Sequence, residues 1–124
     1  MDETNIVAVD FDPVDGFIYW TDLAHGISRI SIDGHYKETI VIDEVEQPDG
    51  IAVDHQGRNL FWTDNITKRI EVIRLDGKHR KLLISHDLEE PRDITLDMKN
   101  GYIYWSDWGS RPRIERAWMD GTNR

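Results

Sequence analysis

The 124-residue chain contains no cysteine, which excludes a disulfide framework, thiolate metal ligands and a cysteine nucleophile. It also has no apolar run that approaches the roughly 20 residues of a membrane-spanning helix. Positive charge is scarce, because 15 Lys and Arg stand against 24 Asp and Glu and give a formal net charge of −9. An acidic chain binds phosphate backbones poorly, so we expect no nucleic-acid binding and no direct membrane contact.

Motifs that carry catalytic or metal chemistry are also missing. The five histidines form no paired ligand pattern, and there is no nucleophile elbow, phosphate-binding loop or dinucleotide fingerprint. The sequence therefore predicts no catalytic residue, no metal site and no cofactor. The histidines are His25, His35, His55, His79 and His86.

The main signal that is present is an internal repeat. Three related tetrapeptides occur, Tyr-Trp-Thr-Asp at 19–22, Phe-Trp-Thr-Asp at 61–64 and Tyr-Trp-Ser-Asp at 104–107. An apolar segment that ends in Asp precedes each tetrapeptide, and a segment that ends in Asp-Gly follows it. Markers in one order and at one period divide the chain into three units, at about 6–48, 49–91 and 92–124.

Each unit reads as short β-strands, because its segments are rich in β-branched and aromatic residues and are separated by Gly, Pro, Asp or Asn. The second unit shows four strands most clearly, at about 51–54, 59–64, 69–75 and 80–85. Four antiparallel strands per repeat of this length are typical of a propeller blade. The sequence predicts an all-β chain of about three blades, the third without its outer strand.

Finer features of the repeat lead to further expectations. Isoleucines three residues apart in the third strand, as at Ile70 and Ile73, break strict alternation and predict a β-bulge there. The repeated Trp residues are expected to pack between blades, and the repeated Asp residues to accept hydrogen bonds. These structural residues are Trp20, Trp62 and Trp105, with Asp22, Asp64 and Asp107.

The tetrapeptides resemble the signature of low-density lipoprotein receptor class B, or YWTD, repeats, and the resemblance covers nearly the whole chain. It implies a six-bladed β-propeller, of which this chain is about half, from an extracellular or cell-surface protein. Strings such as Arg-Ile-Glu-Val at 69–72 are similar to the branch of receptor-related proteins that includes the Wnt co-receptors. Met1-Asp2-Glu3 does not look like a signal peptide, which predicts an internal piece of such a parent.

Strand topology indicates where a ligand would bind. In an antiparallel meander the loops after the second and fourth strands lie at one end of the sheet. The resemblance implies that this end receives protein ligands and that Asp49, Arg92 and Trp108 match ligand-contacting positions, with Glu89 and Glu90 nearby. Trp108 could instead pack against a neighbouring loop. The loops at this end are 23–26, 43–50, 65–68, 87–93 and 108–112.

The leading hypothesis is an extracellular protein-binding module, not an enzyme, whose partners are secreted proteins such as Wnt-pathway ligands or antagonists. One alternative is an excised or engineered fragment that self-associates, two copies completing a ring of six blades. Another is a calcium-dependent propeller hydrolase with Asp49 and Asp93 directed at the metal. Asn65-Ile66-Thr67 fits the N-glycosylation pattern in a predicted loop, which makes Asn65 a candidate acceptor.

Overall fold

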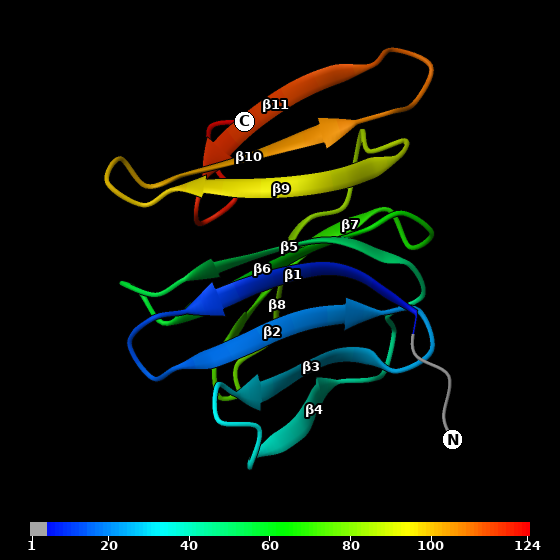
Figure 1. The fold of residues 1–124 in the computed structure, drawn as a ribbon. Helices are drawn as coiled ribbons and strands as arrows, with labels where there is room; N and C mark the ends of the chain where they lie inside the picture. The colour runs from blue at the N-terminus through cyan, green and yellow to red at the C-terminus, as the bar shows by residue number, and fades with distance from the viewer. Residues whose placement is uncertain (1–4) are drawn as a thin grey trace.

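A computed structural model describes residues 5–124, all of whose regular structure is β-strand (Figure 1). Residues 1–4, which hold the sequence Met1-Asp2-Glu3, lie outside the described residues. Within 5–124 there is no helix long and apolar enough to cross a membrane. The strands are β1 (Ile6–Asp12), β2 (Phe17–Asp22), β3 (Gly26–Ser31), β4 (Lys37–Val41), β5 (Pro48–Asp54), β6 (Asn59–Asp64), β7 (Arg69–Arg74), β8 (Lys81–Ile84), β9 (Pro91–Asp97), β10 (Tyr102–Asp107) and β11 (Arg113–Trp118).

The strands form three antiparallel sheets in chain order, which we call blade 1 (β1–β4), blade 2 (β5–β8) and blade 3 (β9–β11). The all-β class and the four-stranded repeat are confirmed, and within the described residues blade 3 has three strands, as expected. The first strand of blade 2 begins at Pro48, three residues before the predicted start at 51. Proline is tolerated at the first position of a strand, where it need not donate to the ladder.

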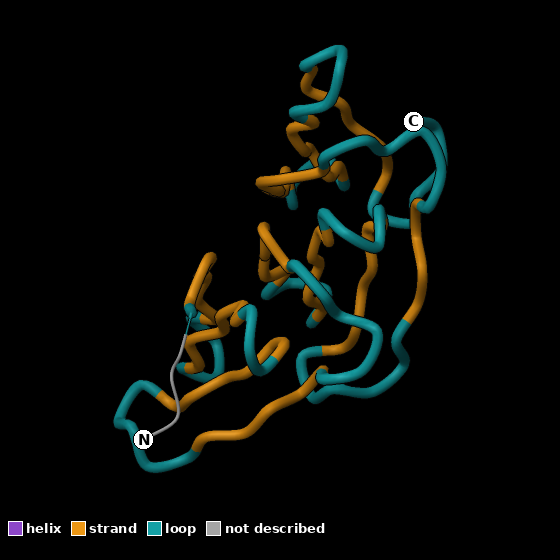
Figure 2. Tube along the Cα trace, turned by 90° about the vertical axis from the view of Figure 1, so that its right-hand side faces the viewer, coloured by secondary structure: helices purple, strands orange, loops and turns teal. Residues whose placement is uncertain are grey.

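The blades lean on one another along their first strands. β1 lies beside β5 and β5 beside β9, and the three sheets fan out from this line (Figure 2). Gly50 permits the close approach of β5 and β9, because a Cβ atom there would lie 2.3 Å from the carbonyl oxygen of Arg92. Any larger residue at this position would push the two first strands apart.

Two apolar clusters fill the spaces between blades. The first joins Tyr19 and Ile27 of blade 1 to Leu60 and Trp62 of blade 2. The second joins the opposite face of blade 2 to blade 3 and includes Trp105. Trp62 and Trp105 are therefore buried between blades, each on the face that meets the preceding blade.

A cation covers the tetrapeptide Trp in each blade. The guanidinium of Arg80 lies 5.3 Å from the ring centre of Trp62 and donates a 2.8 Å hydrogen bond to the backbone carbonyl of Asp43, in the loop that joins blade 1 to blade 2. Arg124 lies 5.4 Å from the ring centre of Trp105 and donates to backbone carbonyls in 86–87, in the loop that joins blade 2 to blade 3. Each pair therefore ties its blade to the loop that comes from the preceding blade.

Trp20 occupies the equivalent place in blade 1 but is only half-buried. Its face of blade 1 meets no other blade among residues 5–124, and only Lys37 lies over its ring, at 5.7 Å. Within the described residues the indole N–H groups of Trp62 and Trp105 have no acceptor, so ring area and the facing guanidinium hold these side chains in place.

The sequence predicts a β-bulge in the third strand of a blade, but the extra residue lies in the fourth strand. Ile70 and Ile73 belong to different interblade clusters, so they point to opposite faces of β7 in regular alternation. β7 pairs with β6 without interruption. The register shift lies between β7 and β8, where the extra residue is Leu83 of the fourth strand. A strand that is covered on both faces carries apolar residues on both. Two isoleucines three residues apart can then point to opposite faces, and their spacing alone does not distinguish this case from a bulge.

The tetrapeptide Asp residues join two loops at one end of each blade. Asp107 accepts 3.0 Å bonds from the backbone N–H groups of 89–90, before β9, and a 2.9 Å bond from Gly109, after β10. Asp22 and Asp64 accept backbone bonds from the matching loops of blades 1 and 2. Each buried carboxylate thereby fixes the loops on both sides of the first hairpin.

Arg58 departs from the repeat in an informative way. It adopts φ +63°, at the position where the other units have Gly16 and Gly101 at φ +72° and +79°. Its guanidinium donates bonds of 2.9 and 2.7 Å to the buried Asp12 of blade 1 and a 2.6 Å bond to Asp15. Burial raises the pKa of Asp12, but Arg58 and local backbone donors outweigh it and hold the pKa below its usual value. The interblade ion pair thus offsets an unfavourable backbone conformation.

Replacing Arg58 tests the balance between this strain and the ion pair. Arg58→Ala should lower the free energy of unfolding by about 2–3 kcal/mol, below the ~3–5 kcal/mol of a fully buried pair, because 27% of the Arg58 side chain is exposed. Arg58→Gly should be about 1 kcal/mol less harmful, since glycine tolerates positive φ. Urea unfolding measures both; equal losses would show that the backbone is unstrained.

Acid should weaken the loop ties. Burial raises the pKa of Asp107, but the backbone donors and Arg113 outweigh it and set the pKa below the ordinary value. The pKa of Asp107 is lower in the folded chain than in the unfolded chain. The contribution of its carboxylate to the free energy of unfolding is therefore present above about pH 4 and is lost as pH falls through the folded pKa. Asp107→Asn should cost about 1–3 kcal/mol at pH 7.

The difference between the wild type and Asp107→Asn should shrink below about pH 4, where the wild-type carboxylate is protonated. Urea unfolding at pH 7, 5 and 3 measures it. Glu46→Gln, at an exposed position, serves as the control and should follow the wild type at every pH. A difference that stays constant down to pH 3 would contradict the proposed role of the charge.

Candidate functional site

The loops after the second and fourth strands gather at one end of the blades, which we call the loop face. It consists of residues 23–25, 42–47, 65–68, 85–90 and 108–112. This end is the right-hand side of Figure 1 and faces the viewer in Figure 2. The second residues of β5 and β9, Asp49 and Arg92, lie at the same end, so the topology brings the predicted site residues together.

Arg92 is the centre of a compact cluster. Its guanidinium bonds the Asp49 carboxylate at 2.7 Å and contacts Glu90 at 3.4 Å. The ring of Trp108 lies over it, 5.0 Å from guanidinium carbon to ring centre. Asp49 keeps only 8% of its side chain exposed, whereas 64% of Trp108 is exposed. The cluster therefore presents an aromatic ring to solvent on a base of paired charges.

Glu89 lies beside this cluster and organises the loop after β10. Its carboxylate accepts bonds from the backbone N–H of Ser110 and, at 3.0 Å, from the Ser110 hydroxyl. These two donors lower the pKa of Glu89, so the group is ionised at neutral pH. The Lys68 ammonium, from the blade 2 loop, donates to the backbone carbonyl of Glu89.

The backbone of this region is fixed from below. The Trp108 N–H donates a 3.0 Å bond to the Glu90 carbonyl, and Asp107 binds the backbone on both sides of the same contact. Trp108 thus stands on a loop whose conformation is set by buried bonds, while its ring stays free of other aromatic contacts in the part of the chain that the structure describes.

Trp108 had two readings from the sequence, ligand contact or packing against a loop. In the structure its ring packs on Arg92 and remains mostly exposed, so it retains surface for a partner. Two contributors were missed by sequence reasoning, Lys68 and Ser110. Single polar or charged residues in turns carry no pattern of their own, and the roles of these two follow from a contact between blades and a contact across a loop.

Both carboxylates that could point toward a central metal already have partners in the structure. The Asp49 carboxylate is paired with the Arg92 guanidinium, and the Asp93 carboxylate accepts a 3.0 Å bond from the Ile94 N–H. Among residues 5–124 no group of three or more His, Cys, Asp or Glu side chains could hold a metal ion. Three carboxylates and two cations leave the cluster with a negative formal charge, from Asp49, Glu89, Glu90, Arg92 and Lys68.

Asn65 begins the turn between β6 and β7 and is half-buried. Its backbone N–H donates a 2.9 Å bond to the Gln47 carbonyl. The Thr67 hydroxyl of the same acceptor pattern is buried, with no hydrogen-bond partner among the described residues. Glycosylation of Asn65 stays a prediction.

Comparison with known proteins identifies the repeat. Residues 16–55, 58–98 and 101–124 match the model of the low-density lipoprotein receptor repeat class B. The chain is 41% identical over 108 residues to Low-density lipoprotein receptor-related protein 5-like protein of Homo sapiens, which covers 86% of this chain and 43% of that protein. It is 50% identical over 60 residues to Low-density lipoprotein receptor-related protein 5 of Homo sapiens, covering 48% of this chain and 4% of that protein.

Nidogens show the same likeness. Nidogen-2 of Mus musculus is 43% identical over 68 residues, covering 53% of this chain and 5% of that protein. The crystal structure of a nidogen/laminin complex contains a chain that superposes with a TM-score of 0.93 at 44% identity, covering 98% of this chain and 47% of that one. The chain spans less than half the length of each of these relatives. It belongs to the family of low-density lipoprotein receptor class B (YWTD) repeats and folds as part of their β-propeller.

Proposed function

We propose that the chain is a protein-binding module of an extracellular receptor or matrix ectodomain, and that it binds secreted proteins through the loop face. The observation that carries the proposal is the exposed Trp108 ring on the Arg92–Asp49 ion pair. Exposed Trp and Arg side chains on a rigid base are the residue types that dominate interface energetics. Membership of the class B repeat family supports the same function.

The partner chemistry follows from the surface of the cluster. Carboxylates of Glu89 and Glu90 flank the aromatic ring, so a polypeptide loop with basic or amide side chains next to an apolar residue fits best. Secreted Wnt-pathway ligands or antagonists and laminin are candidates, because one relative is a receptor-related protein and another is part of a nidogen/laminin complex. Binding of this kind breaks no covalent bond, and we propose no enzymatic activity.

Asn65 is proposed as a glycan acceptor in a secreted form of the chain. A glycosidase-sensitive mass increase that Asn65→Gln removes would support this, and an unmodified secreted chain would refute it.

Changes at the cluster should weaken binding without unfolding the chain. Trp108→Ala and Arg92→Ala should each raise the dissociation constant for a binding partner by about 30-fold or more, the effect of losing a ~2 kcal/mol hot spot. Asp49→Asn should act through Arg92, which would lose its charged partner. Calorimetry or surface plasmon resonance with laminin and with secreted Wnt-pathway antagonists measures the effect.

Trp118→Ala serves as the matched control. Trp118 is a half-buried Trp that stacks on Tyr102 at 4.1 Å, away from the loop face, so this variant should bind as the wild type does. Circular dichroism of all variants checks that the strands persist. Equal affinity of the Trp108, Arg92 and control variants for a partner that binds the wild type would place the binding site elsewhere.

A further inference from the structure

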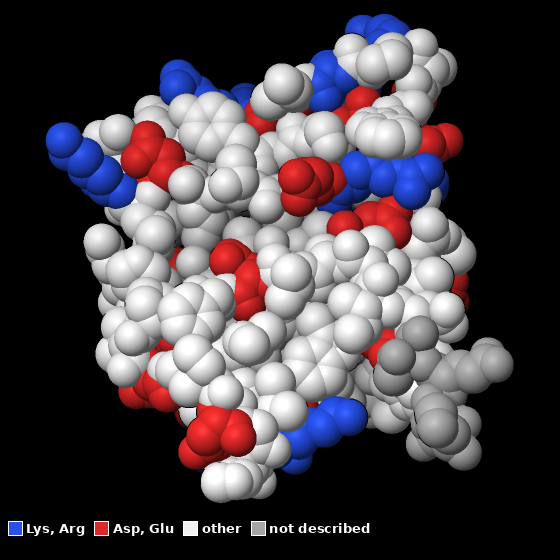
Figure 3. Space-filling view, in the orientation of Figure 1, with Lys and Arg blue, Asp and Glu red and all other residues white. Residues whose placement is uncertain are grey.

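The outer face of blade 1 is mostly apolar, and no other blade covers it within residues 5–124. Val9 is 64% exposed, and Phe11 and Ile32 are also exposed. Together with Ile18 and the acidic Asp10 they line a hollow of about 520 Å³. Figure 3 shows a broad area of mostly uncharged atoms over β1 and β2, interrupted by a few acidic atoms, with most Lys and Arg atoms near the rim of the view. An exposed apolar patch of this size marks a contact site.

The repeat shows what this face is built to contact. The residues of blade 2 that match the apolar positions of the blade 1 face are all buried in the cluster against the preceding blade. The matching pairs are Val9 with Ile51, Phe11 with Val53, Ile18 with Leu60, Trp20 with Trp62 and Ile32 with Leu75. The outer face of blade 1 therefore has the composition of a face that receives another blade.

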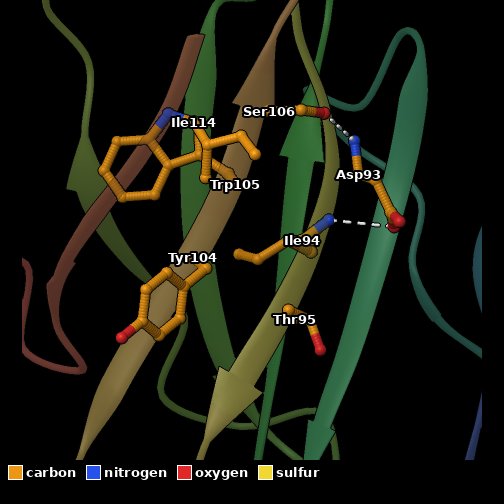
Figure 4. Close-up of a pocket in the computed structure, with 7 residues that line it drawn as sticks. All are labelled: Asp93, Ile94, Thr95, Tyr104, Trp105, Ser106 and Ile114. Atoms are coloured by element: carbon orange, nitrogen blue, oxygen red, sulfur yellow. Dashed lines mark hydrogen bonds between the residues drawn. The ribbon is translucent and has the colours of Figure 1, made fainter.

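The far face of blade 3 is the counterpart. Tyr104, Ser106 and Ile114 line a hollow of about 200 Å³ there, together with residues of β9 (Figure 4). Ile114 is 79% exposed, yet its matches in the other units, Ile27 and Ile70, are fully buried against the next blade.

The other two positions of this face follow the same rule. Tyr104 matches Tyr19 and Phe61, and Ser106 matches Thr21 and Thr63, all of which are buried. The far face of blade 3 therefore resembles the faces with which blade 1 packs on blade 2 and blade 2 packs on blade 3.

We propose that two copies of this chain associate head to tail, blade 3 of each copy packing on blade 1 of the other. The two faces are complementary, because residues at the equivalent repeat positions already meet at both junctions inside one copy. One copy covers 47% of the nidogen chain at a TM-score of 0.93, so two copies in this arrangement approach one full ring. Contacts between unlike faces close when the rotation per copy is right, here a half turn.

The net negative charge of each copy opposes the pairing, and it makes the dissociation constant of the dimer depend on salt. Each copy carries a formal charge of −9, so two copies repel one another through solvent. Salt screens this repulsion and leaves apolar burial largely unaffected. The dimer should therefore tighten as salt is added, opposite to an association held by exposed ion pairs.

Analytical ultracentrifugation of the 124-residue chain tests the proposal. The wild type should sediment at twice its 14.5 kDa chain mass. Val9→Glu on blade 1 and Ile114→Glu on blade 3 should each raise the dissociation constant by about 100-fold or more, because each places a carboxylate in both junctions. Ile66→Glu, at an exposed isoleucine on the loop face, should stay dimeric.

Mixing the two disrupted variants gives the sharpest result. A mixture of Val9→Glu and Ile114→Glu chains retains one intact junction, so it should form a heterodimer that neither variant forms alone. The proposal is overturned by a wild type that stays at 14.5 kDa, by masses that grow without limit, or by pairing that only the blade 1 variant disrupts. It does not involve the loop face, so its failure would leave the proposed ligand site intact.

Discussion

Burial of apolar side chains between successive blades is the interaction on which the rest of this structure depends. Each blade is a thin sheet without a core of its own, and its apolar area leaves water only against a neighbour. At about 25 cal/mol per Å² of apolar area, a buried Trp, with 150–250 Å² of surface, contributes roughly 4–6 kcal/mol. Trp62 and Trp105 are both fully buried at such junctions, where Arg80 and Arg124 cover their rings.

The stacked blades provide the rigidity that the loop face needs. The tetrapeptide that places Trp105 in a junction also places Asp107 two residues later, at the loop end of the same strand. Its carboxylate binds the backbone before β9 and after β10, and Trp108 follows directly. β10 therefore connects the interblade core to the exposed loop face. The loop backbone is already ordered in the free chain, so a partner would not have to order it on binding.

The blades and the position of the loop face could be predicted from the sequence, because residues at matching positions of successive repeats lie in adjacent blades. Asp49 and Arg92 lie one repeat apart at matching positions, so adjacent blades had to bring them close, and the structure joins them at 2.7 Å. The Ile70 and Ile73 pattern misled, because burial on both faces of β7 resembles a local irregularity. The Arg58–Asp12 pair had a readable clue, an arginine where the other units have glycine, but its meaning required the left-handed backbone and the neighbouring blade.

A double-mutant cycle across a junction tests the stacking most directly. Phe61 of blade 2 and Trp105 of blade 3 share one cluster, so Phe61→Leu and Trp105→Phe should show a coupling energy in unfolding of at least about 0.5 kcal/mol. Tyr19→Phe, in the other cluster, should combine additively with Trp105→Phe. Additive effects of the Phe61 and Trp105 changes would contradict the account, because the two blades would then not depend on one another.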